Sequence, residues 1–168
     1  EIVNYMVDES LVAYLERVLQ SAIRNPQSAI EPRLRHLIAY NDEPHRFSEA
    51  ETEQLIKAID TLKILDPACG SGAFPMGVLH KLVFILGKLD PRNARWKGRQ
   101  IDRVVQTMKM AEQIDDSTIR DNTIRDLERE IESINEAFER NELDYGRKLY
   151  LIENCIYGVD IQPIAVQI

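Results

Sequence analysis

Apolar residues recur at helical spacing from the start of the chain to Ile23. They are Ile2, Val3, Met6, Val7, Leu11, Val12, Leu15, Val18, Leu19 and Ile23. A spacing of three and four residues places these side chains on one face of a helix, so the pattern predicts a helix that packs on a core. Asn25-Pro26 ends this helix, because the residue before a proline disfavours helical backbone angles.

Shorter elements follow before residue 66. A second helix is predicted over residues 32–40 and a polar connection over residues 41–47. Ser48 and Glu51 have the spacing of a capping box, which predicts a third helix from this point to about Ile59. The apolar run over residues 62–65 then predicts a strand.

Residues 73–89 are strongly apolar and predict a buried helix. Pro75 falls in its first turn, where the missing N–H costs no hydrogen bond, and Asp90-Pro91 ends it. A helix that is apolar on most sides must be buried, and packing on a sheet would bury it. Strand and helix together therefore favour an α/β fold.

Residues 92–141 predict a helical hairpin. Its first run carries Ile101, Val104, Val105, Met108 and Ala111, and its second carries Ile119, Ile124, Leu127, Ile131, Ile134 and Phe138. The turn is placed at Asp115–Thr118, and a short helix over residues 145–153 and a second strand over residues 155–160 follow. We thus predict an N-terminal helical region (1–61), a first strand, glycine loop and helix (62–91), a helical insertion (92–154) and a second strand that leads into another helix (155–168).

A glycine loop lies between the first predicted strand and the apolar helix. Gly70 and Gly72 let the backbone approach a ligand closely, and the N–H groups of the following helix face the same place. Asp160 ends the second strand, where an acid accepts hydrogen bonds from the hydroxyls of a ribose. The two features are far apart in the sequence, so the helical insertion must loop out between them.

The residues of the loop distinguish between cofactors. From Gly70 the chain reads Gly-Ser-Gly-Ala-Phe-Pro, which lacks the third small residue of a dinucleotide fingerprint and the Gly-Lys-Ser/Thr of a P-loop. Asp66 directly before the loop would repel a pyrophosphate and suits a cationic ligand. We therefore predict a site for S-adenosylmethionine, with its ammonium and sulfonium groups, over a tight turn without a ligand.

Composition is that of an ordinary soluble domain, with 44% hydrophobic and 29% charged residues. The net charge of −7 argues against nucleic-acid binding by the overall field, so any such contact needs a local patch. One candidate patch surrounds Trp96 and consists of Lys88, Arg92, Arg95, Lys97, Arg99, Arg103 and Lys109, with solvated surface as the alternative.

The presence of only two cysteines and the lack of a long apolar run predict a cytoplasmic protein without a membrane span.

Three stretches resemble a known family, the adenine-N6 DNA methyltransferases. Residues 66–74, Asp-Pro-Ala-Cys-Gly-Ser-Gly-Ala-Phe, are similar to its cofactor-binding motif I. Residues 156–163 resemble motif II, and residues 1–7 resemble the helix after motif X. The nearest resemblance is to the large methylase–restriction proteins of bacteria, of the type IIG and phage-exclusion kinds. It implies a partial Rossmann-like fold of the class I S-adenosylmethionine-dependent methyltransferases, rich in helices.

The resemblance also implies a role for each matched residue. Asp66 and the backbone of residues 68–72 would hold the methionine end of the cofactor, Asp160 would bind the ribose, and Ile161 would pack on the adenine ring. The implied cofactor-binding residues are Asp66, Pro67, Ala68, Cys69, Gly70, Ser71, Gly72, Asp160 and Ile161. In the family a flipped adenine is held by an Asn/Asp-Pro-Pro-Tyr/Phe motif.

That catalytic motif is absent, because no two prolines of this sequence are adjacent. We therefore predict no catalytic residue and no metal ligand here. The chain is expected to be the inactive N-terminal, cofactor-binding fragment of a methyltransferase that meets DNA through its full length. Unpaired sheet edges would favour self-association of such a fragment.

Two other functions fit the same sequence. One is methyl transfer from S-adenosylmethionine to RNA, protein or a small molecule. The other is a helical interaction module that keeps the glycine motif without binding a ligand, which the long polar hairpin favours. A measurement of cofactor binding distinguishes the interaction module, which would not bind, from any methyltransferase, which would.

Overall fold

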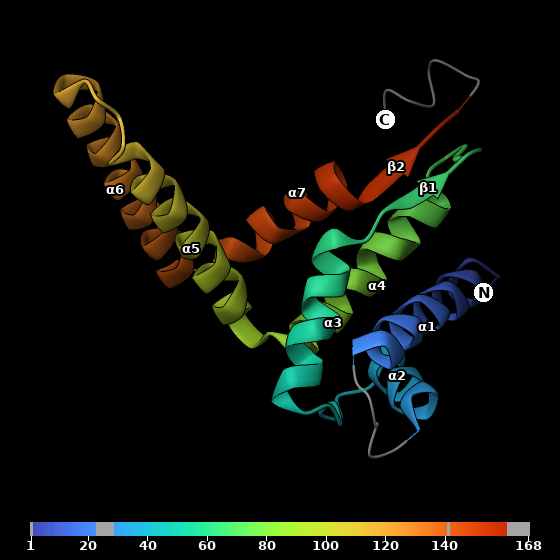
Figure 1. Ribbon diagram of the computed structural model, residues 1–168. Helices are drawn as coiled ribbons and strands as arrows, with labels where there is room; N and C mark the ends of the chain where they lie inside the picture. The colour runs from blue at the N-terminus through green and yellow to red at the C-terminus, as the bar shows by residue number, and fades with distance from the viewer. Residues whose placement is uncertain (1, 23–28, 141, 161–168) are drawn as a thin grey trace. The chain divides into compact units, whose positions relative to one another are not determined.

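The computed structural model describes residues 2–22, 29–140 and 142–160. Figure 1 shows the helices and strands in chain order. They are α1 (Ile2–Ala22), α2 (Ile30–Ile38), α3 (Glu49–Thr61), β1 (Ile64–Asp66), α4 (Ala73–Leu89), the 3-10 turn η1 (Pro91–Asn93), α5 (Ala94–Ala111), α6 (Ser117–Glu139), α7 (Leu143–Cys155) and β2 (Ile156–Gly158). The chain forms two compact units, of which unit 1 is Glu1–Leu89 with Lys148–Ile168 and unit 2 is Asp90–Arg147.

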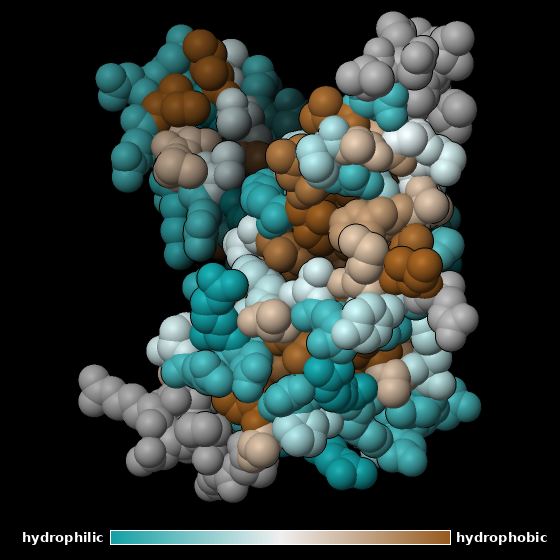
Figure 2. Space-filling view, turned by 90° about the vertical axis from the view of Figure 1, so that its right-hand side faces the viewer, coloured by the Kyte–Doolittle hydropathy of each residue, from teal (hydrophilic) through white to brown (hydrophobic). Residues whose placement is uncertain are grey.

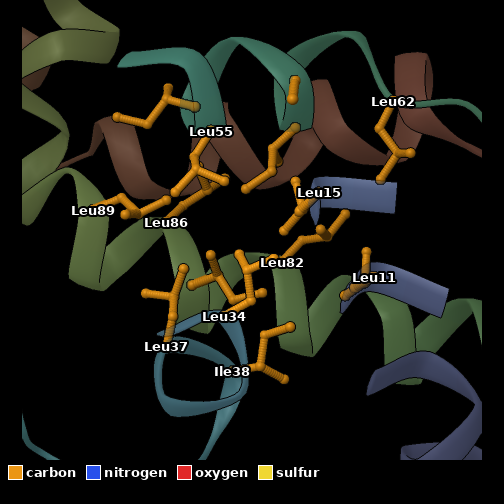
Figure 3. Packing of buried hydrophobic residues seen from close by; sticks show 14 of the residues in the cluster. Leu11, Leu15, Leu34, Leu37, Ile38, Leu55, Leu62, Leu82, Leu86 and Leu89 are labelled. Carbon is orange, nitrogen blue, oxygen red and sulfur yellow. The ribbon is translucent and has the colours of Figure 1, made fainter. Parts of the chain in front are cut away.

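Unit 1 has a core of aliphatic side chains held between four helices. Leucines and isoleucines of α1, α2, α3 and α4 point toward one another and fill the space between these helices (Figure 3). α4 packs on each of the other three and also on β2. Its bounds are those predicted, and Leu82 and Ile85 in its middle are completely buried. The helical periodicity predicted for α1 and α4 is thereby confirmed.

The capping box at the start of α3 is also confirmed. The Glu51 N–H donates to Ser48 Oγ over 3.3 Å, and the Ser48 N–H donates to Glu51 Oε2 over 2.8 Å. Arg33 on α2 donates to both carboxylate oxygens of Glu51, over 2.9 and 2.5 Å, and its guanidinium lies over the ring of Phe47. The hydrogen bond from Arg33 and those from Ser48 lower the pKa of Glu51 to about 2.

A lysine side chain lies inside the core of unit 1. Lys81 on α4 is 1% exposed and donates to the carbonyl oxygen of Ile38 over 3.1 Å. Its Nζ lies 2.9 Å from Asp8 Oδ1 and 3.7 Å from the centre of the Tyr40 ring. Because Asp8 lies on α1 and Tyr40 follows α2, these contacts tie three segments of unit 1 together.

The expected α/β, Rossmann-like fold is wrong. The described residues form seven α-helices and one pair of parallel strands of three residues each, with Leu65 opposite Tyr157. The first predicted strand is shortened because Leu62 caps the end of α3, and the second because α7 continues to Cys155. α4 buries its apolar surface mainly against helices rather than on a sheet, which removes the reason for expecting layers of helix on sheet.

The outer side of the two strands is apolar and reaches solvent. Leu65 is 61% exposed and Tyr157 is 42% exposed. Figure 2, which views the molecule from the side of the strands, shows hydrophobic side chains at the surface among hydrophilic ones. Within the described ranges, no helix combines the length and the hydropathy that a membrane span requires.

Unit 2 contains the predicted helical hairpin, formed by α5 and α6. The connection begins earlier than predicted, since α5 ends at Ala111, and Asp116 caps α6 by accepting from the N–H groups of Thr118 and Ile119.

The base of the hairpin holds a buried ion pair. Asp90 accepts hydrogen bonds from the N–H groups of Arg95 and Trp96, and from Arg147 Nη1 over 2.8 Å. The side chains of Asp90 and Arg147 are almost completely buried, so each supplies the counter-charge of the other away from water.

Candidate functional site

The glycine loop and Asp160 lie side by side although they are remote in sequence. Asp66 pairs with Gly158 at the end of the parallel strands. The N–H of Val159 then donates to the Asp66 carbonyl over 2.9 Å. The N–H of Gly70 donates to Asp160 Oδ2 over 2.8 Å. The structure thus joins the two segments that carry the predicted site residues.

Hydrogen bonds donated by backbone N–H groups fix the shape of the loop. Asp66 Oδ1 accepts from the N–H of Ala68 over 3.1 Å, and the N–H of Cys69 donates to the Val159 carbonyl over 3.0 Å. Gly70 and Gly72 have φ angles of +50° and +76°. A side chain is strained at such angles, so these two positions need glycine for conformation.

The predicted residues differ in how far they reach solvent. Pro67, Ala68, Gly70 and Ser71 are exposed, whereas Asp66, Cys69, Gly72 and Asp160 are half-buried. Ile161, the predicted partner of the adenine ring, lies outside the described residues. The loop is therefore held by half-buried groups and presents its middle to solvent.

The charges and dipoles at the loop fit a zwitterionic cation better than a phosphate. Two carboxylates, Asp66 and Asp160, lie on the two joined segments. α4 begins at Ala73, directly after Gly72, so the N–H groups of its first turn open toward the loop. A ligand with both a carboxylate and a cationic centre satisfies both features.

Gly158 makes a contact that the sequence did not predict. A Cβ atom added to Gly158 would lie 3.1 Å from Cys69 Sγ and 3.2 Å from Cys69 Cβ. The signal in the sequence was a glycine two residues before the predicted ribose-binding acid. The sequence alone could not show this role of Gly158, because the loop that it contacts is remote in sequence.

The N-terminal stretch that resembles the helix after motif X is the start of α1. It lies against α4, because a Cβ atom added to Gly77 would lie 2.9 Å from Val3 Cγ1. Within this N-terminal stretch, Glu1 lies outside the described part of the chain. The helix that follows the glycine loop thus packs closely on the start of α1.

The aromatic residue of the candidate nucleic-acid patch is buried. Trp96 is only 4% exposed, so its ring is not available for stacking on a base. Lys97 and Arg92 instead lie over the ring of Phe138, at 4.4 and 5.8 Å from its centre. The cations of this segment therefore serve partly to hold the hairpin together.

No protein-family model matches the chain, and no curated protein or solved structure is significantly similar to it. The interpretation of the site therefore rests on its residues and their geometry. The resemblance to adenine-N6 DNA methyltransferases remains a hypothesis based on the motif residues.

Proposed function

We propose that this chain binds S-adenosylmethionine as part of an adenine-N6 DNA methyltransferase of a restriction-modification or phage-defence system. The observation that carries the proposal is the 2.8 Å hydrogen bond from the Gly70 N–H to Asp160 Oδ2. It brings an acid from a distant part of the sequence next to a glycine loop, which a plain turn does not require.

Each part of the loop has a role in this proposal. The N–H groups at the start of α4, which directly follows the loop, hold the methionine carboxylate, because N–H groups at a helix start attract anions. Asp66 supplies negative charge for the ammonium and sulfonium groups. Asp160 accepts hydrogen bonds from the ribose hydroxyls while it holds Gly70.

The DNA substrate rests on the motif resemblance alone. Because these 168 residues lack adjacent prolines, they lack the motif that holds the target adenine in the family. We therefore expect cofactor binding without methyl transfer to DNA by this chain. Incubation with tritium-labelled cofactor and duplex DNA tests this, since any label transferred to DNA would contradict the expectation.

Calorimetric titration with S-adenosylmethionine and with S-adenosylhomocysteine tests the proposed site. Asp160→Asn keeps an oxygen that can accept from Gly70 but removes the charge that the ribose hydroxyls need. We expect this variant to bind at least about tenfold more weakly, as the loss of a charge-assisted hydrogen bond implies. Asp42→Asn makes the same chemical change at an exposed loop position and is expected to bind like the wild type.

The helix-rich architecture favours one alternative, a helical interaction module that binds no cofactor. The same titration separates the two functions. No heat of binding from a wild-type sample whose helical circular dichroism shows it to be folded would refute cofactor binding and favour the interaction module.

A further inference from the structure

Gly158 is exposed to solvent on one side and lies against the glycine loop on the other, where a Cβ atom would fit only if Cys69 shifted by a few tenths of an ångström. The added Cβ atom would meet Sγ and Cβ of Cys69 at 3.1 and 3.2 Å. Packed carbon atoms prefer about 3.5–4.0 Å. Gly70 and Gly72 differ from Gly158, because nothing lies within 4 Å of a Cβ atom added at either of them. Gly158 therefore allows two segments to approach closely, whereas the loop glycines are needed for their backbone angles.

The contact stands next to the hydrogen bonds that join the two motifs. Gly158 pairs with Asp66, and the residue after it exchanges hydrogen bonds with Asp66 and Cys69. One residue further along, Asp160 accepts from Gly70. Because Gly70 directly follows Cys69, a shift of Cys69 away from Gly158 would act on the hydrogen bond between Gly70 and Asp160.

We infer that Gly158 is a positioning residue of the cofactor site, which sets the separation of the glycine loop from the second strand. The absent side chain lets Cys69 lie on the strand, and this contact holds the Gly70 N–H within reach of the Asp160 carboxylate. The inference rests on the proposed function, because cofactor affinity is what this separation controls.

Calorimetry on four variants tests the inference. Gly158→Ala is expected to weaken binding of S-adenosylmethionine about tenfold, as expected for loss of one charge-assisted hydrogen bond. Cys69→Gly removes both atoms that the added Cβ would meet, so adding Gly158→Ala to Cys69→Gly should weaken binding by less than about threefold. Gly87→Ala is the control, because Gly87 lies exposed on α4 with nothing within 4 Å of the added atom.

The thiol of Cys69 gives a second measurement that needs no cofactor. Cys69 is half-buried, while the other cysteine, Cys155, is completely buried and its thiol donates toward the Ile59 and Asp60 carbonyls. Burial also raises the pKa of Cys155, so a disulfide reagent such as Ellman's reagent reacts first with Cys69. Gly158→Ala should displace Cys69 and speed this reaction severalfold, whereas Gly87→Ala should leave its rate unchanged.

The two measurements separate failure of the inference from failure of the proposed function. If the wild type binds the cofactor and Gly158→Ala has the same affinity and thiol rate, the inference is wrong and the function stands. If the wild type does not bind the cofactor, the proposed function is wrong. The reaction rate of the Cys69 thiol then tests the contact alone. A faster reaction in Gly158→Ala supports the contact, and an unchanged rate overturns it. Should Gly158→Ala not fold, recovery of folding in the double variant with Cys69→Gly supports the contact, and continued failure overturns it.

Discussion

Replacing Asp8 is expected to destabilise unit 1 more than replacing Lys81, although the two residues form one ion pair. The difference follows from their burial, since 2% of the Lys81 side chain is exposed and 33% of the Asp8 side chain is exposed. Asp8→Asn leaves a buried ammonium without its counter-charge, whereas Lys81→Met leaves a carboxylate that water can reach. Losing the counter-charge of a deeply buried ion costs more than exposing the other ion to water.

The magnitudes follow from the geometry. The two charges lie 2.9 Å apart. With an effective dielectric constant of about 20, this separation gives an attraction of about 6 kcal/mol. Because solvent reaches Asp8 and screens this attraction, we expect the loss of unfolding free energy in Asp8→Asn to be about 2–4 kcal/mol. The Ile38 carbonyl and the Tyr40 ring still stabilise the ammonium in Asp8→Asn, which keeps the loss within this range.

The loss in Lys81→Met has a different origin. Methionine keeps the apolar stem of the lysine and leaves one carbonyl oxygen, that of Ile38, without its donor. A buried acceptor without its donor costs about 1–2 kcal/mol. The double variant should lose about as much as Lys81→Met alone, because the carboxylate has no partner once the ammonium is gone.

Urea unfolding followed by circular dichroism at pH 7 measures these losses. Glu9→Gln on the same helix is the control, since Glu9 and Arg35 pair at the surface and their contact should add little. A Lys81→Met variant that is less stable than Asp8→Asn, or single losses that add in the double variant, would refute the reasoning.

Three further predictions concern helix starts and ion pairs. The folded-state pKa of Glu51 is lowered from its ordinary 4.5 to about 2 by Arg33. The lowered pKa of Glu51 therefore contributes at most about 3 kcal/mol to the free energy of unfolding above pH 5, and this contribution is lost as the pH falls toward 2. In Glu51→Gln this part of the pH dependence should be missing from urea unfolding, and an unchanged slope between pH 5 and 2 would contradict the assignment. Ser48→Ala removes one half of the capping box and should lower the unfolding free energy by about 1 kcal/mol in the same assay; an unchanged midpoint would show that the box does not stabilise α3. Asp90→Asn removes the carboxylate charge that faces the buried guanidinium of Arg147 and should cost about 3–5 kcal/mol. Fluorescence of the single tryptophan measures the unfolding, and a loss below about 1 kcal/mol would exclude this role.

The helices could be predicted because their signals are local. The apolar spacing of α1, the bounds of α4 and the capping box at Ser48 depend on residues within a few turns of one another. The contacts that hold the elements together are remote in sequence. Lys81 lies in a helix that was predicted to be buried, but nothing near it in the sequence identifies its ion-pair partner, because Asp8 lies on another helix.

The fold class was predicted wrongly because burial of a helix does not identify what buries it. The apolar helix α4 suits a sheet or a layer of helices equally well by its sequence. In this chain α1, α2 and α3 supply the apolar surface that covers it, and the strands shrink to three residues each. Conversely, the loop conformation was predictable in part, since Gly70 and Gly72 both adopt the positive φ angles for which glycine is favoured.

The geometry of the candidate site does not depend on a large sheet. Its two segments are joined by a short ladder that begins at the strand pair and continues beyond it, through Val159 to Asp66 and then through Gly70 to Asp160. Each of these hydrogen bonds uses residues of the two segments themselves. Close approach at Gly158, which lies in the stretch that resembles motif II, is a further feature of this ladder. The correction of the fold class therefore leaves the proposed site intact, and its test lies in Asp160 and Gly158 rather than in the number of strands.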